Sequence, residues 1–151
     1  MMVITKKVRK RDLWILLAAV AAIAAVLLIP GRKKAPADTV WKAETNEQRV
    51  AFLSSFGWEV EPSPVRTQEL RVPTGENAVF SRYNELQKYQ GYDLTQYAGK
   101  TVKRYIYKIT NYPGSDEGWY ATVLVSGSRV VGGDVASAKK GGIMHSLKMP
   151  A

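Results

Sequence analysis

Residues 119–131 read WYATVLVSGSRVV, and this stretch decides the fold class. Every second residue from Trp119 to Val125 is apolar, which is the period of a β-strand that buries one face. Ser-Gly-Ser at 126–128 is typical of a tight turn, and the two valines that follow it start a returning strand. The stretch therefore predicts an antiparallel hairpin, and the Gly-Gly-Asp at 132–134 predicts a bulge or a strand end there.

More strands precede this hairpin. Residues 100–111 alternate between two faces, and Pro113-Gly114 turns the chain from this strand into the hairpin. Residues 58–61 and 65–72 are extended runs separated by Pro-Ser-Pro, which predicts a hairpin or two edge strands.

Two helices complete the predicted domain. Thr45 and Gln48 have the spacing of a capping box, and Gly57 ends the helix that they begin. Thr74 is the expected cap of a second helix, which ends at Gly91. The predicted order is α-β-β-α-β-β-β, an α+β domain over residues 45–149 in which helices cover one face of an antiparallel sheet.

An apolar segment bounded by Leu13 and Ile29 reads LWILLAAVAAIAAVLLI and contains no charge. At ~1.5 Å per residue, a helix of this length reaches roughly 26 Å, close to the ~30 Å of a hydrocarbon layer. Five basic side chains precede the segment and three follow it, so the positive-inside rule places residues 1–12 in the cytoplasm. We expect one transmembrane helix at 13–29, a linker at 30–44 and an extracytoplasmic domain.

A cleaved signal peptide is the alternative for the same segment. Ala35-Pro36-Ala37 offers a small-x-small cleavage site, so that the domain would be secreted after cleavage at Ala37. The apolar run is longer than the ~7 to 15 residues of a typical signal core, which favours the anchor. Both alternatives place the domain outside the cytoplasm.

The net charge of +9 is concentrated at the front of the chain. Residues 1–37 hold eight of the 22 basic side chains and one of the 13 acidic ones. The remaining 14 basic and 12 acidic side chains nearly balance, which argues against a nucleic-acid partner. The chain has no cysteine, which excludes disulfides, thiol catalysis and zinc–thiolate sites.

All eight tyrosines lie between Tyr83 and Tyr120. Tyrosine combines a large apolar ring with a polar tip and so suits a recognition surface, although it also fills the cores and edge strands of small domains. The candidate binding surface consists of Tyr92, Tyr105, Tyr107, Asn111, Tyr112 and Trp119. Its expected partners are an envelope protein or an anionic wall polymer.

No motif of a known catalytic, cofactor or metal site is present, so we expect no catalytic residue, no cofactor and no metal. His145 is the only histidine, and no nucleophile or metal-ligand pattern surrounds it. The alternative is an envelope hydrolase or transferase that takes its acid and base from Glu85, Asp93 and Asp134. Caps and turns are the structural explanation for Asp93 and Asp134.

Five short motifs carry a family resemblance: YNELQ at 83–87, GYDL at 91–94, YAGK at 97–100, NYP at 111–113 and GGD at 132–134. Between about Phe52 and Leu147 the chain resembles a family of uncharacterised bacterial proteins, a domain of unknown function behind an N-terminal membrane segment. The resemblance implies domain limits and anchoring, and no activity.

The expected function is a non-enzymatic, membrane-tethered binding or protein-interaction domain at the cell envelope. One alternative is the hydrolase or transferase described above. Another is an accessory subunit of a membrane complex, in which the anchor makes the main contacts.

Overall fold

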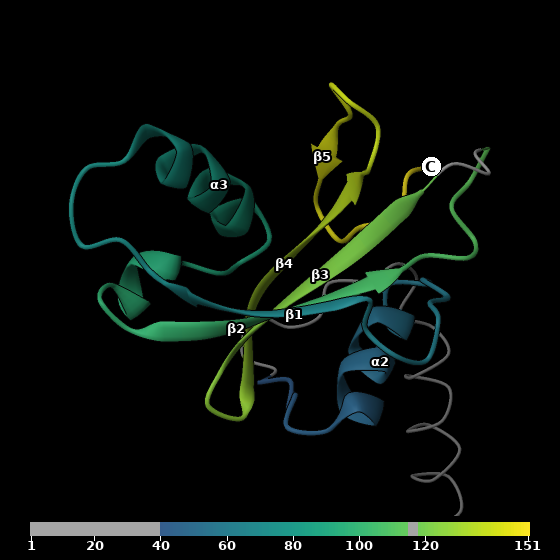
Figure 1. Cartoon of the computed structure of the whole chain (residues 1–151), viewed down its shortest axis with the longest axis horizontal. Coiled ribbons are helices and arrows are strands. Elements are labelled where there is room, and N and C mark those ends of the chain that lie inside the picture. Colours follow the sequence, from purple (N-terminus) through teal and green to yellow (C-terminus); the bar gives the residue numbers. More distant parts are fainter. Residues whose placement is uncertain (1–39, 115–117) are drawn as a thin grey trace, which may run out of the picture. The chain divides into compact units, whose positions relative to one another are not determined.

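The computed structural model describes residues 40–114 and 118–151. Its elements follow the order α2 (Asn46–Ser54), β1 (Arg66–Arg71), α3 (Ala78–Tyr89), the 3-10 helix η1 (Leu94–Tyr97), β2 (Thr101–Lys108), β3 (Trp119–Ser126), β4 (Arg129–Ser137) and β5 (Met144–His145). Within these residues the strands form one five-stranded antiparallel sheet in the order β1-β2-β3-β4-β5 (Figure 1). Each strand therefore pairs with its neighbours along the chain, and β1 and β5 are the edges.

The hairpin predicted from residues 119–131 is confirmed. β3 and β4 pair from Trp119 opposite Ser137 to Ser126 opposite Arg129. Leu124 pairs with Gly132 and Val125 pairs with Val130, so Val131 is the extra residue of a bulge. It lies directly before the Gly-Gly-Asp segment where a bulge or a strand end was expected, and β4 continues through that segment.

The predicted element order, however, is wrong. Residues 58–61 form no strand, because only Val60 makes a β-bridge, to Ile109. Pro62 and Pro64 follow at once, and proline has no N–H to donate to a ladder. At the other end of the sheet, β5 was not predicted, since a strand of two residues has no detectable period.

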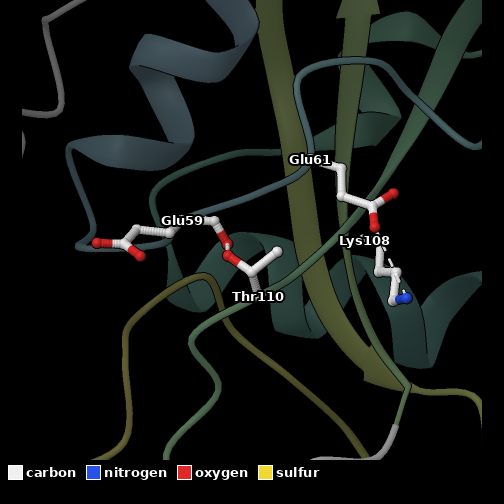
Figure 2. A network of polar contacts seen from close by, with 4 residues as sticks. All are labelled: Glu59, Glu61, Lys108 and Thr110. Carbon is white, nitrogen blue, oxygen red and sulfur yellow. Dashed lines mark hydrogen bonds and ion pairs between the residues drawn. The ribbon is translucent and has the colours of Figure 1, made fainter.

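The chain nevertheless stays beside β2 before β1 begins. Figure 2 shows the Thr110 hydroxyl, which donates to the Glu59 carbonyl oxygen at 3.2 Å, and the ion pair of Lys108 with Glu61 at 3.7 Å. Both side chains of the ion pair are about half exposed, so water screens the pair and it contributes about 1 kcal/mol or less to stability.

The predicted transmembrane helix at 13–29 lies outside the described residues, as do residues 1–12 and most of the linker. In the described parts, 40–114 and 118–151, no helix is long and apolar enough to cross a membrane. The fold class is therefore corrected to a small domain with a five-stranded antiparallel sheet and two α-helices.

The expectation that helices cover one face of the sheet is also wrong, because α2 and α3 lie on opposite faces (Figure 1). Phe52 of α2 belongs to a cluster with Ala121 and Val123, whereas Phe80 of α3 packs against a cluster that includes Leu124. β3 is buried on both faces, and a strand of that kind needs a covering layer on each side.

The helix caps were predicted with mixed success. The capping box of Thr45 and Gln48 at the start of α2 is confirmed. The cap of α3 is Asn77 and not Thr74, because the Asn77 side-chain oxygen accepts a hydrogen bond from the Phe80 N–H at 3.0 Å. Asparagine is at least as good a cap as threonine, and here it lies directly before the first helical turn.

A side chain of α3 closes part of the outer edge of β4. β5 pairs only with Val135 and Ala136. Next to that pairing, the Gly133 N–H donates to Gln87 Oε1 at 2.9 Å and its carbonyl oxygen accepts from Gln87 Nε2 at 2.9 Å. A Cβ on Gly132 would lie 2.7 Å from Gln87 Oε1, so glycine is what allows this approach. The Gln87 amide therefore takes the place of a peptide group from a neighbouring strand.

Leu147 ties the C-terminal segment to the domain. Its side chain is fully buried, and its N–H donates to Gln90 Oε1 at 2.8 Å. Its carbonyl oxygen accepts from the Trp58 indole N–H at 2.6 Å. The segment that contains β5 is thus fixed by residues from α3 and from the loop after α2.

Candidate functional site

Four aromatic side chains from separate segments meet near the C-terminal segment. Trp58 follows α2, Tyr112 lies in the loop between β2 and β3, Trp119 begins β3 and His145 ends β5. Asn111 positions the first of them, because its amide group donates to the Gly57 carbonyl and accepts from the Glu59 N–H, both at 2.9 Å. Trp58 is therefore held on both sides along the chain.

The ring of Tyr112 is stacked with two indoles. Its centroid lies 3.7 Å from that of Trp119 with an interplanar angle of 1°, and 5.6 Å from that of Trp58 with an angle of 12°. Both indoles are buried, whereas Tyr112 is half-buried. Parallel stacking on the two buried indoles fixes the plane of the Tyr112 ring.

His145 contacts the hydroxyl of Tyr112. Its Nδ1 lies 2.6 Å from the Ser146 carbonyl oxygen, which can only accept, so Nδ1 carries the proton. In neutral His145 the other nitrogen, Nε2, then accepts the hydroxyl of Tyr112 at 2.9 Å. Burial raises the pKa of Tyr112, so the phenol keeps its proton at neutral pH. The pair is a donor–acceptor dyad with a fixed tautomer.

An open hollow of about 500 Å³ lies beside this dyad. Tyr112 and His145 line it together with Ile143, Lys148 and Met149. The side chain of Ile143 is 64% exposed, which is high for a large apolar residue at a concave site. The hollow thus combines apolar surface, one cation and an oriented phenol–imidazole pair.

A comparison with protein families matches residues 52–135 to one described as "Domain of unknown function (DUF4830)". The chain belongs to the DUF4830 family. The matched span contains Trp58, Tyr112 and Trp119, whereas His145 lies beyond it. No curated protein and no solved structure matches the chain. The resemblance to an uncharacterised domain family is confirmed, and the expected bacterial origin and membrane anchoring stay predictions.

Of the six residues predicted to bind a ligand in this DUF4830 domain, Tyr112 alone lines the hollow. Tyr107 is fully buried, and its hydroxyl accepts from Arg49 Nε at 3.0 Å and donates to Asn46 Oδ1 at 2.8 Å. The Arg49 guanidinium also lies 3.7 Å from the ring centroid of Tyr105. These two tyrosines attach α2 to β2. They therefore have the packing role that the sequence analysis gave as the alternative to a recognition surface.

The remaining predicted residues serve the domain in other ways. Tyr92 is partly buried against the cluster on the α2 face, and burial raises its pKa to about 12. Trp119 stacks on Tyr112, and Asn111 fixes the backbone on both sides of Trp58. His145 was missed as a site residue, because its contact with Tyr112 spans 33 positions and no local pattern marks it.

The three candidate catalytic carboxylates have different surroundings. Glu85 is exposed on α3. Asp93 caps η1, as predicted, and hydrogen bonds from Thr95 and Asn84 lower its pKa to about 2. Among residues 40–114 and 118–151, no group of three or more histidine, aspartate or glutamate side chains is placed to hold a metal.

Asp134 is a buried carboxylate on the α3 face of the DUF4830 sheet. Its side chain is 1% exposed, Oδ2 accepts the Tyr83 hydroxyl at 2.6 Å, and Oδ1 has no partner among the described residues. Burial raises the pKa of Asp134, and the Tyr83 hydrogen bond and the charge of Arg104 only partly oppose this. Neither Glu85 nor Asp93 hydrogen-bonds to it, so these three residues form no hydrogen-bonded acid–base pair.

We expect Asp134→Asn to stabilise the domain at neutral pH. Because the folded-state pKa of Asp134 lies above the ordinary 3.8, the native domain binds more protons than the unfolded chain above about pH 4. The free energy of unfolding therefore falls as pH rises from about 4 through the folded pKa, and the neutral amide removes this loss while keeping an acceptor for Tyr83. Urea unfolding between pH 4 and 8 measures it.

Asp93→Asn is the matched control, because its pKa shift has the opposite sign. The lowered pKa of Asp93 stabilises the fold above its unfolded pKa and is lost only as pH falls towards 2, so this variant is expected to be less stable at neutral pH. Unchanged pH dependence in Asp134→Asn would contradict the assignment of a buried carboxylate cost to Asp134.

Proposed function

We propose that this DUF4830 domain is a non-enzymatic protein-binding module of the cell envelope, whose partner inserts an apolar side chain into the hollow beside Tyr112. The observation that carries the proposal is the exposed Ile143 next to the fixed edge of Tyr112 and His145 in one concave site. Apolar side chains placed in pockets and rimmed by polar groups are the usual energetic centre of a protein interface.

The stacking geometry favours a protein partner over a wall polymer. A sugar ring binds tyrosine or tryptophan through an exposed aromatic face. Here the ring of Tyr112 is stacked with Trp119 and Trp58, and both indoles are buried. Beside Tyr112 the hollow is lined by the apolar side chains of Ile143 and Met149, which suit an apolar side chain of the partner.

The charge at the hollow indicates which residue type lies next to the partner's inserted apolar side chain. Lys148 lines the hollow, and none of its lining side chains is acidic. An acidic residue of the partner beside the inserted side chain would meet this cation and would guide the orientation of binding.

The location is part of the proposal. The apolar segment at 13–29 holds the chain in the cell membrane, with the domain on the extracytoplasmic side. The chain has no cysteine, so Val79→Cys on the exposed face of α3 is a single reporter. In intact cells, a membrane-impermeant maleimide labels it if the domain is outside, and fails to label it if the domain is cytoplasmic.

The other two candidate functions have less support. A hydrolase or transferase needs two cooperating carboxylates, whereas here Glu85 is exposed on α3, Asp93 caps η1 and Asp134 accepts from Tyr83. An accessory subunit that works through its anchor predicts that an unrelated anchor abolishes binding, whereas the hollow proposal predicts that binding survives the exchange.

Ile143→Asp is expected to weaken capture of the partner by about 30-fold, since the loss of a central apolar contact costs about 2 kcal/mol or more. The measurement is quantitative recovery of each protein cross-linked to the tagged full chain in intact cells. Lys148→Glu should lower the recovery of the same protein through the reversed charge. Recovery unchanged by both substitutions would overturn the proposal.

Val79→Asp is the matched control, because Val79 is an exposed apolar residue, 81% exposed, that does not line the hollow. It introduces the same charge on α3 and should leave recovery unchanged. Equal loss in this variant and in Ile143→Asp would show that the effect comes from added charge alone, and would also count against the hollow.

A further inference from the structure

β1 is an edge strand with few neighbours. Every residue of β1 except Gln68 is exposed, which means that both faces of the strand are open as well as its outer edge. Edge strands of this kind are templates for another strand unless charge, proline or a bulge protects them. Pro64 and Pro73 flank β1, and the strand itself carries the charges of Arg66, Glu69 and Arg71.

The outward-facing backbone groups follow from the pairing with β2. The N–H of Val72, directly after β1, donates to the Lys100 carbonyl at 2.9 Å. Because N–H and C=O groups alternate in direction along a strand, even-numbered residues bond to β2. Thr67, Glu69 and Arg71 therefore direct their peptide groups away from the sheet.

The side chains of this open stretch are self-complementary. Glu69 and Arg71 are two residues apart on one face, both are exposed, and neither forms an ion pair with another described residue. Leu70 lies between them on the opposite face and is 39% exposed. Charges of one sign would repel a second copy of the same edge, whereas this edge carries both signs around an apolar residue, so each charge can meet its opposite in an antiparallel copy.

We propose that β1 is the contact through which two copies of this chain associate, with the two β1 strands antiparallel around a twofold axis at Leu70. In this register Glu69 of each copy lies opposite Arg71 of the other, and the two leucines meet at the axis. The outward peptide groups of Glu69 and Arg71 supply the ladder hydrogen bonds on both sides of the axis. The contact joins two five-stranded sheets into one, independently of the hollow at the C-terminal segment.

Charge decides between this register and its neighbours. A shift by one residue along each strand centres the pair on Glu69 and places two carboxylates opposite each other, which is destabilising. A further shift centres it on Gln68 and leaves both charges without a partner. The register at Leu70 alone satisfies Glu69 and Arg71 together.

Cysteine cross-linking in the full chain tests the register directly, because the chain has no cysteine of its own. Directly opposed, non-hydrogen-bonded residues of antiparallel strands have Cα atoms about 4.5 Å apart, within the ~4.4 to 6.8 Å span of a disulfide. Under a mild oxidant, Leu70→Cys is expected to form a disulfide dimer at least tenfold faster than Gln68→Cys or the exposed Val79→Cys. Equal rates for the three variants would overturn the proposal.

Charge exchange provides the second test, with the oligomeric mass measured by sedimentation equilibrium. Arg71→Glu places two pairs of carboxylates opposite each other, and the dimer fraction should fall at least tenfold. The double variant Glu69→Arg with Arg71→Glu exchanges the pair between the copies and should restore the dimer fraction in part, because an arginine at position 69 also lies opposite Lys103 of β2. A monomeric wild-type chain, or equal dimer fractions in all three, would overturn the proposal whatever the outcome of partner capture at the hollow.

Discussion

Trp58→Ala is expected to remove most of the stability of the domain. The side chain is 1% exposed, and truncation of a buried aromatic residue costs about 3 to 5 kcal/mol. The substitution also leaves the buried Leu147 carbonyl without the indole N–H, which costs about 1 to 3 kcal/mol more. Because whole domains are stable by only about 5 to 15 kcal/mol, urea denaturation followed by circular dichroism should show a variant near its unfolding midpoint in buffer.

Trp58→Phe separates the two contributions. Phenylalanine keeps much of the volume and can stack on Tyr112, but it has no N–H for Leu147. The expected loss is about 1 to 3 kcal/mol from the unpaired carbonyl, together with a smaller packing term. If Trp58→Phe were as damaging as the alanine variant, the hydrogen bond and not packing would hold the C-terminal segment. An alanine variant that lost under about 1 kcal/mol would contradict both terms.

Gln87→Leu is the second substitution with a large expected effect. The side chain is fully buried and bonds both peptide groups of Gly133, so leucine leaves the Gly133 N–H unpaired at a cost of about 1 to 3 kcal/mol. The Gly133 carbonyl keeps a second donor, Gln90 Nε2, at 2.9 Å. Removing the Gln87 donor from this carbonyl therefore costs less stability than removing the acceptor from the N–H. Amide hydrogen exchange should show faster exchange at Gly133 than at neighbouring positions of β4.

Gln90→Leu is the matched control for Gln87→Leu. It removes one of two donors to the Gly133 carbonyl and frees the Leu147 N–H, but it leaves the bond between Gln87 and the Gly133 N–H in place. Exchange at Leu147 should then rise while exchange at Gly133 stays slow. The reverse pattern, or no change at Gly133 in Gln87→Leu, would mean that the side-chain amide does not serve as a strand substitute.

The parts of the fold that were predictable are those encoded over short distances. The alternation in residues 119–131 spans a single hairpin, and the capping box of Thr45 and Gln48 spans one helical turn. Residues 58–61 alternate equally well, but two following prolines leave them a single bridge, at Val60. Coverage of both sheet faces was not predictable, because it depends on where each helix packs and not on the pattern of either helix alone.

The site was harder to predict from the sequence, because it too depends on how distant segments pack. The clustered tyrosines differ in their surroundings: Tyr107 is buried and bonds Arg49 and Asn46 of α2, whereas Tyr112 lies in the loop after β2 and is half-buried. The contacts that build the site join distant positions, with a sequence separation of 33 for Tyr112 and His145 and of 89 for Trp58 and Leu147. Those pairs are set by tertiary packing, and no local spacing indicates them.

Gln87 affects whether further copies of the chain can add to a dimer formed through β1. Fibrous polymers of β-proteins add strands without limit only when a sheet is open on both sides. In the described domain, the β4 side is occupied by the helix's own amide and by the two residues of β5, which are a poor template. Association through β1 then consumes the open side and ends there. Gln87 and β5 together therefore limit the association to a finite assembly and prevent continued addition of strands.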